Sequence, residues 1–258
     1  MFAVKRYRCC SPAKHPPREL WLLLLMAASC VSVSAPQAAA TAWTVVGLHP
    51  STALESFAKC VDDNTQGGWT NTPYRGAIWA GTSSSVAFVS TSSAVVHALY
   101  GGDKAGWVAS RAALWRGATN EYTDLHPWGA ETSFVFGMFG STQAGETSWG
   151  VGSGQHVGYH ATLWTGSADS WQDLSPVGSS DSHLAAIDAS GEAGRFRASV
   201  SSPYHAALWH GTAQSVVDLH PSGAYASQAQ AISNGRQGGY VQFVRDGPSH
   251  AALWSGTA

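Results

Sequence analysis

The chain has 258 residues, of which only 12% are charged and 44% are hydrophobic, with 28 glycines and 12 tryptophans. This apolar content excludes a disordered chain, and the glycine and aromatic content favours short strands joined by tight turns. Residues 41–258 hold nine Lys and Arg against 15 Asp and Glu, a formal net charge of −6. That balance argues against a nucleic-acid partner, because such a partner requires a basic surface.

Residues 1–40 have the composition of a secretory signal peptide. A start rich in Lys and Arg precedes the apolar run Trp21–Ala35, and the small residues Ala38–Ala40 satisfy the A-x-A rule for cleavage. A single membrane anchor is disfavoured, because the strongly apolar part, Trp21–Ala28, is too short to cross about 30 Å of hydrocarbon. We therefore expect an exported protein, extracellular or periplasmic, whose mature chain makes no stable membrane insertion.

The cysteines add one alternative and one constraint. Cys30 follows Ala-Ala-Ser, which weakly resembles a lipoprotein signal and leaves lipid anchoring at Cys30 open, although the usual Leu three places earlier is absent. Cys9 and Cys10 also lie in the signal segment, so Cys60 is the only cysteine of residues 41–258. No intramolecular disulfide is expected, and the fold must be stabilised by its core.

A repeat of about 44 residues extends over the rest of the chain. Leu-Trp or Ile-Trp, followed two residues later by Gly, occurs five times. The tryptophans are Trp79, Trp115, Trp164, Trp209 and Trp254. Their spacings are 36, 49, 45 and 45 residues, a period typical of repeat architectures. We expect each tryptophan to be core, because the same large apolar side chain recurs in every unit.

Two further features run in phase with the tryptophans. Segments of the type Asp-Leu-His-Pro end at Pro50, Pro127, Pro176 and Pro221, and Ala87–Thr91 takes their place in the second unit. A glycine near the middle of each unit is followed by a residue that differs from unit to unit. These variable residues are Trp69, Trp107, Glu146, Arg195 and Tyr240.

The last unit can be divided into short strands. Ser227–Ser233 alternates small and apolar residues, an Asn-Gly pair marks a hairpin, and Gly238–Val244 and His250–Gly256 follow as the second and third strands. In the preceding unit, Ser215–Pro221 adds a fourth strand. Four short strands per unit are typical of a propeller blade.

The two ends of the mature chain are complementary. The last unit stops after its third strand, and Thr41–Pro50 resembles the missing fourth strand. The sequence therefore predicts an all-β fold, a five-bladed β-propeller of four-stranded blades, closed by pairing of Trp43–Leu48 with the strand that contains Leu253 and Trp254. The predicted repeats are 51–91, 92–127, 128–176, 177–221 and 222–258, with 41–50 added to the last.

The repeat resembles the bacterial extracellular repeat family named for its His-Ala-Phe tripeptide, which precedes Leu-Trp. Here Ala or Thr replaces Phe after His160, His205 and His250, and two units begin with Arg75 and Arg111 instead of His. The resemblance covers essentially the whole mature chain and implies an exported, propeller-like repeat protein without implying any activity. A weaker similarity, in blade number and aromatic content alone, is to five-bladed invertebrate lectins.

The histidines at the ends of the strands are expected to cap turns. Hairpin geometry predicts that His205 lies beside Asp218 and His220, and that His250 lies beside His49. Two His and an Asp could bind a metal such as Zn²⁺. Other units have Arg or Ser at these positions, so we expect neither a metal nor another cofactor.

The variable residues after the mid-unit glycines are the ligand-binding candidates. Aromatic side chains can stack on sugar rings, and Glu146 and Arg195 can add hydrogen bonds, although each candidate could instead pack locally. The leading hypothesis is a secreted, non-catalytic propeller that acts as a binding or interaction scaffold for an unknown protein or glycan. The first alternative is a carbohydrate-binding lectin. The second is a glycoside hydrolase, in which Glu131 or Asp103 would have to lie near Glu146 as the second carboxylate.

Overall fold

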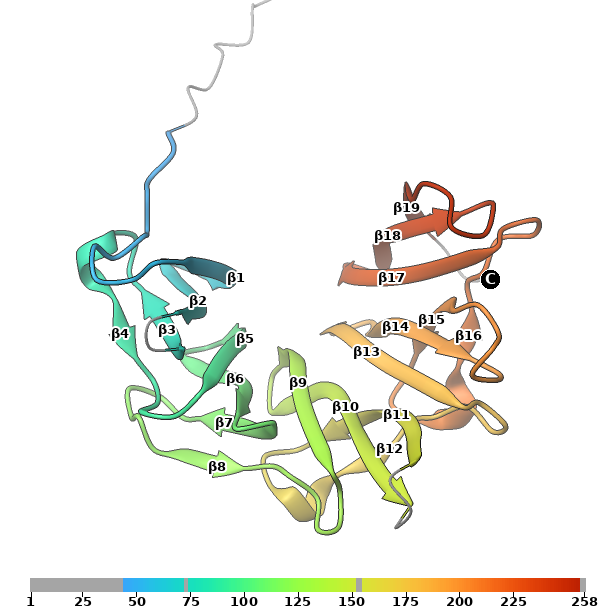
Figure 1. The fold of residues 1–258 in the computed structure, drawn as a ribbon, viewed down its shortest axis with the longest axis horizontal. Helices are drawn as coiled ribbons and strands as arrows, with labels where there is room; N and C mark the ends of the chain where they lie inside the picture. Colours follow the sequence, from blue (N-terminus) through green and yellow to red (C-terminus); the bar gives the residue numbers. More distant parts are fainter. Residues whose placement is uncertain (1–43, 72–73, 152–154, 256–258) are drawn as a thin grey trace, which may run out of the picture. The chain divides into compact units, whose positions relative to one another are not determined.

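The computed structural model describes residues 44–71, 74–151 and 155–255. The predicted signal peptide, residues 1–40, and the alternative lipid anchor at Cys30 lie outside these ranges. The described elements belong to one compact unit, Val45–Ala258, and are almost all β-strands (Figure 1). The all-β prediction is therefore confirmed. Within the described ranges, no helix is long and apolar enough to cross a membrane.

The strands form five antiparallel sheets, and each sheet falls within one predicted repeat. The first sheet contains β1 (Ser56–Asp62), β2 (Thr65–Thr70), β3 (Arg75–Trp79) and β4 (Ala87–Phe88). The second contains β5 (Ala94–Tyr100), β6 (Asp103–Val108), β7 (Arg111–Trp115) and β8 (Tyr122–Asp124). The third contains β9 (Thr132–Phe139), β10 (Thr142–Val151), β11 (Gln155–Trp164) and β12 (Gln172–Asp173).

The last two sheets differ in strand number. The fourth contains β13 (Asp181–Asp188), β14 (Gly191–Arg197), β15 (His205–Trp209) and β16 (Val217–Asp218). The fifth contains β17 (Ala226–Ser233), β18 (Arg236–Gln242) and β19 (His250–Ser255). Short 3₁₀ helices precede the fourth strands of the first, third and fourth sheets: η1 (Ser83–Ser85), η2 (Ala168–Ser170) and η3 (Ala213–Ser215).

The three-stranded fifth sheet corrects the predicted closure. Residues 44–50 contain no strand, and β19 pairs with β18 alone within the described part of the chain. Val45 and Val46 are exposed, and so is Leu253 on β19; Trp43 lies outside the described residues. Every other fourth strand follows its third strand directly in sequence. The predicted pairing would instead join two distant ends of the chain, which costs more conformational entropy.

The mid-unit glycines accommodate a bulge that recurs in the first strand of every sheet. Opposite the glycine, the first strand contains one residue without a cross-strand partner. A Cβ atom on the glycine would lie 1.8 Å from a carbonyl oxygen of this strand in the first sheet and 1.9 Å in the others. The five glycines are Gly68, Gly106, Gly145, Gly194 and Gly239. Only glycine allows the two backbones to approach this closely.

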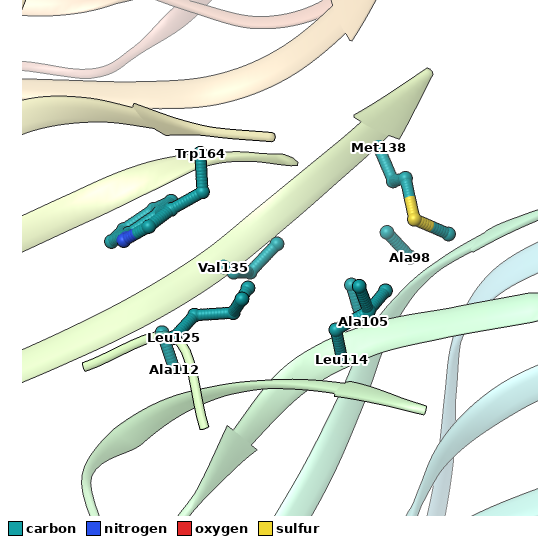
Figure 2. Packing of buried hydrophobic residues seen from close by; sticks show 8 residues of the cluster. All are labelled: Ala98, Ala105, Ala112, Leu114, Leu125, Val135, Met138 and Trp164. Carbon is teal, nitrogen blue, oxygen red and sulfur yellow. The ribbon is translucent and has the colours of Figure 1, made fainter. Parts of the chain in front are cut away.

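The repeated tryptophans form the core between sheets. Trp164 on β11 lies in one cluster with Leu114 and Leu125 from the second sheet and its connection, and with Val135 on β9 (Figure 2). It therefore fills the space between its own sheet and the preceding one. Four of the tryptophans, Trp79, Trp115, Trp164 and Trp209, are at most 1% exposed.

The burial prediction is thus confirmed for Trp115, Trp164 and Trp209, and only in part for Trp254. The Trp254 side chain packs against the fourth sheet, and its indole nitrogen donates to the Leu219 carbonyl at 2.8 Å. It is nevertheless partly exposed, because β19 lacks a following strand to cover it.

Candidate functional site

The first strands of the five sheets border one pocket. Each of these strands contacts the first strand of the next sheet, from β1 through β5, β9 and β13 to β17 (Figure 1). The pocket between them has a volume of about 600 Å³, within the range of small-molecule sites. The bulged residue of every first strand lines it. These residues are Lys59, His97, Phe136, Ala185 and Gln230.

The bulge explains how a repeat can build such a pocket. A β-bulge turns the extra residue away from the regular alternation of the strand. Because every unit contains the bulge at the same place, five side chains are directed toward a common centre. The sequence varies at this place in every unit, so the pocket is lined by a cation, a histidine, an aromatic ring, a methyl group and an amide.

The five candidate residues lie beside this pocket, but only two of them line it. Glu146 and Arg195 belong to the pocket wall, whereas Trp69, Trp107 and Tyr240 do not. Glu146 is buried, and the other four are partly buried. The same repeat position therefore contributes to the pocket wall in two sheets, and the side chain at each position determines what it contacts.

Candidate residues contact the first strand of the next sheet. Trp107 packs edge-on against Phe134, with ring centroids 5.9 Å apart and an interplanar angle of 88°. Glu146, one sheet further along, accepts a hydrogen bond from His183. Phe134 and His183 occupy equivalent positions, each paired across its sheet with the next candidate residue. Trp107 and Glu146 thus make contacts between sheets, and Glu146 lines the pocket as well.

An aromatic stack covers the first two sheets. Trp69 lies between Phe57 and Tyr74, with a centroid distance of 4.6 Å to each ring. Tyr74 continues to Trp107 at 6.2 Å. The local-packing alternative therefore describes Trp69 and Trp107 well, since their faces are occupied by other rings of the protein.

His183 is held between two carboxylates. Its Nε2 lies 2.7 Å from Asp181 Oδ1, and its Nδ1 contacts the Glu146 carboxylate. When both carboxyl groups are ionised they can only accept, so both ring nitrogens then donate and the ring is an imidazolium. Burial alone would lower the pKa of His183, but the hydrogen bonds to Asp181 and Glu146 raise it above its ordinary value. The side chain is 12% exposed and faces the pocket.

Asp181 anchors this histidine and has no free oxygen. Besides His183, it accepts hydrogen bonds from Tyr204 Oη at 2.8 Å, Arg197 Nη2 at 2.6 Å and the Tyr159 backbone N–H at 3.3 Å. Burial by itself would raise the pKa of Asp181, but these donors and the His183 charge hold it well below its usual range. Asp181 is therefore a fixed anion that positions the imidazolium.

Arg195 is the cation of this wall without a counter-charge. Its Nη1 donates to Gln228 Oε1 at 2.8 Å, an oxygen that also accepts from Tyr240 at 3.2 Å. The guanidinium lies over the Tyr204 ring, 4.1 Å from its centroid. Its Nε is buried without an acceptor, and no carboxylate pairs with Arg195 among the described residues. A second cation, the exposed Lys59, enters the pocket from β1.

The hydrolase alternative requires a second carboxylate beside Glu146, and neither Asp103 nor Glu131 supplies it in the pocket. Asp103 accepts from the Gly117 backbone N–H at 2.8 Å, and neither Asp103 nor Glu131 lines the pocket. The carboxylate associated with Glu146 is Asp181, with the His183 ring between them.

Sequence reasoning missed Asp181 and His183, together with Tyr159, Arg197 and Tyr204. A signal was available, because ionisable residues at 181 and 183 interrupt a strand that is otherwise small or apolar in most units. It could not show that these side chains meet Glu146 from another unit.

The histidines at the ends of the strands make hydrogen bonds and ring contacts within the repeats. His205 Nδ1 lies 2.9 Å from Asp218 Oδ2 and stacks on His220 at a centroid distance of 3.8 Å. His220 in turn contacts Ser227 Oγ at 2.8 Å and the Ala224 carbonyl at 3.2 Å. These contacts use Nδ1 of His205 and both ring nitrogens of His220. Throughout the described ranges, no group of three or more His, Cys, Asp or Glu residues is arranged as a metal site.

The predicted contact between His250 and His49 is wrong. His49 Nδ1 lies 2.9 Å from Ser56 Oγ in the first sheet. The His250 ring packs edge-on against Phe243 at 5.6 Å. The two histidines would meet only if residues 45–48 paired with β19, which they do not.

No protein-family model matches the chain, and no curated protein or solved structure matches it either.

Proposed function

We propose that the five sheets are blades of a β-propeller and that the protein is a non-catalytic binding protein, with its ligand in the pocket between the first strands. The observation that carries this proposal is the set of five bulges that direct five different side chains into one pocket. A core repeat needs identical packing residues, whereas recognition of one ligand needs asymmetry. The signal-like composition of residues 1–40 supports export, so the ligand would be met outside the cytoplasm.

The hydrogen bonds of the charged residues support binding without catalysis. Both oxygens of Asp181 are occupied, and His183 uses both ring nitrogens on carboxylates. Glu146 is already paired with the imidazolium. Hydrolysis of a glycoside needs one carboxylic acid and one free carboxylate on either side of the bond. Here each carboxylate already contacts the His183 ring, so the hydrolase alternative has no support from this geometry.

A carbohydrate is the ligand class that the lining favours. The Phe136 ring is part of the lining, and Gln228, Gln230 and His97 offer hydrogen-bonding groups around it. Sugar recognition combines ring stacking with a few directed hydrogen bonds. This lining supports the lectin alternative over a site for another protein, whose contact surface is usually broader.

A glycan array tests the proposal when it is combined with a variant that fills the pocket. Ala185→Trp replaces a methyl group on the pocket wall by an indole and leaves the charged network intact. We expect the purified protein to bind at least one glycan, Ala185→Trp to lose that binding, and the control Val200→Trp to retain it, because Val200 is exposed on a loop. Retained binding by Ala185→Trp would place the ligand elsewhere and refute the pocket.

A further inference from the structure

We infer that the ligand of this pocket is an acidic sugar whose carboxylate is bound by Arg195, an inference that rests on the proposed function. It names the chemistry that the pocket lacks and that a ligand would have to supply.

The positive and negative charges on the pocket wall formed by β10, β13 and β14 do not balance. Two carboxylates, Asp181 and Glu146, are both used by His183, and Arg197 also pairs with Asp181. Arg195 remains after these pairs are made, and it lies close to the His183 imidazolium, which has the same sign. The wall therefore has a surplus positive charge at Arg195.

A second cation without a carboxylate partner lines the pocket from β1. Lys59, on the bulge of β1, also lines the pocket and pairs with no carboxylate among the described residues. Residues 41–258 have a formal net charge of −6, and yet these two cations without a carboxylate partner line the same pocket. An anion bound at Arg195 would remove the cost of its partly buried, uncompensated charge, and the exposed Lys59 would add a weaker attraction.

The Arg195 guanidinium is held in place by neighbouring side chains before a ligand binds. Gln228 holds one guanidinium nitrogen at 2.8 Å, and the Tyr204 ring lies against the guanidinium face at 4.1 Å. The side chain has therefore already lost most of its rotamer freedom before a ligand arrives. A planar, fixed guanidinium is the geometry that binds a carboxylate through two parallel hydrogen bonds.

The aromatic ring and the neutral histidine of the lining indicate the rest of the ligand. Phe136 on β9 packs edge-on with His97 on β5 at 5.2 Å, and both line the pocket. Burial, with the Lys59 charge, lowers the pKa of His97 to about 4, so its ring is neutral at pH 7 and can hydrogen-bond a hydroxyl without adding charge. A hydroxyl-rich ring that carries one carboxylate matches this lining, and phosphate, which a guanidinium also binds through two hydrogen bonds, is the competing anion that the experiment must distinguish.

The experiment is a titration of the purified protein with D-glucuronate and D-galacturonate, using D-glucose and D-galactose as matched neutral sugars and inorganic phosphate as a third probe. Isothermal calorimetry measures each Kd. We expect at least one acid to bind at least tenfold more tightly than its neutral counterpart and than phosphate. Arg195→Gln should weaken that binding at least tenfold, and Arg245→Gln, at an exposed arginine away from the pocket, should leave it unchanged.

A second variant keeps the inference testable if Arg195→Gln fails to fold. Lys59 is exposed, so Lys59→Gln should fold normally and weaken binding of the acid severalfold. Equal binding of acids and neutral sugars, preference for phosphate, binding that Arg195→Gln leaves unchanged, or no binding of either acid would each overturn the inference. If a glycan on the array still depends on Ala185, the proposed pocket function stands although the acidic sugar is wrong.

Discussion

The same repeat positions contain stacked aromatic rings in the first two sheets and a network of charges from the third sheet onward. In the first region Trp69 and Trp107 fill the variable position and stack on other rings. In the second, Glu146 and Arg195 fill it and hydrogen-bond to His183 and Gln228. The backbone is equivalent in both, with a bulge opposite a glycine. The repeat therefore dictates where a side chain lies, and leaves its chemistry free.

This difference gives the pocket two unlike sides. Aromatic packing needs no partner of a particular charge, so the first two sheets can be rigid without any ligand. In a buried network of charges, each charge without an opposite partner is costly. Arg195 is held by Gln228 and Tyr204 but has no carboxylate partner among the described residues, so the second side is where a ligand would change the energy most.

The largest expected effect tests the core that both regions share. Trp209→Ala and Trp115→Ala should each lower the free energy of unfolding by about 3–5 kcal/mol, because each removes a fully buried indole between sheets. Trp254→Ala should cost clearly less, since this residue is partly exposed. Urea denaturation measures all three. A Trp209→Ala variant that unfolds at the same urea concentration as the parent would mean that the sheets do not share a tryptophan core.

The next effect separates the two sides of the pocket by their pH dependence. Burial and the Lys59 charge lower the pKa of His97 from 6.5 to about 4, so the unfolded chain binds a proton first as the pH falls. The stability linked to neutral His97 is present above pH 6.5 and is lost as the pH falls toward 4. His183 has the opposite sign, because its pKa is raised: its contribution is present at low pH and is lost as the pH rises through that pKa.

His97→Phe isolates the first of these two contributions. Between pH 6.5 and 4 the parent should lose at most about 3 kcal/mol more stability than this variant, measured by urea denaturation across the range. Phenylalanine keeps the aromatic contact with Phe136 and removes the titration. A difference between parent and variant that does not change with pH would contradict the burial of His97 in a pocket wall.

The smallest effect measures the aromatic side directly. A double-mutant cycle on Trp107 and Phe134, each replaced by Leu, should give a coupling energy of about 0.5–1.5 kcal/mol, the range for edge-on aromatic pairs. The cycle uses the free energies of unfolding of the parent, both single variants and the double variant. A coupling near zero would indicate that burial alone, without the ring geometry, accounts for this contact.

The sequence predicted some residues of the candidate site and missed others. Glu146 and Arg195 were found because they follow the repeated glycine, and they do line the pocket. The bulged residues Lys59 and His97 were missed, because a bulge inserts a residue without a fixed sequence signature. His183 was missed because its importance comes from contact with a residue 37 positions away.

The sequence by itself determined the repeats, the strands within them and the tryptophan core. These properties are local or periodic: alternation of side chains, an Asn-Gly hairpin between β17 and β18, and one large apolar residue per unit. Only the tertiary structure decided which side chains share the pocket, how the charges of Asp181, His183 and Glu146 pair, and that residues 45–48 do not pair with β19. Each of these depends on contacts between residues far apart in the chain, where the entropy of closing a long loop competes with the contact and no local pattern records the outcome.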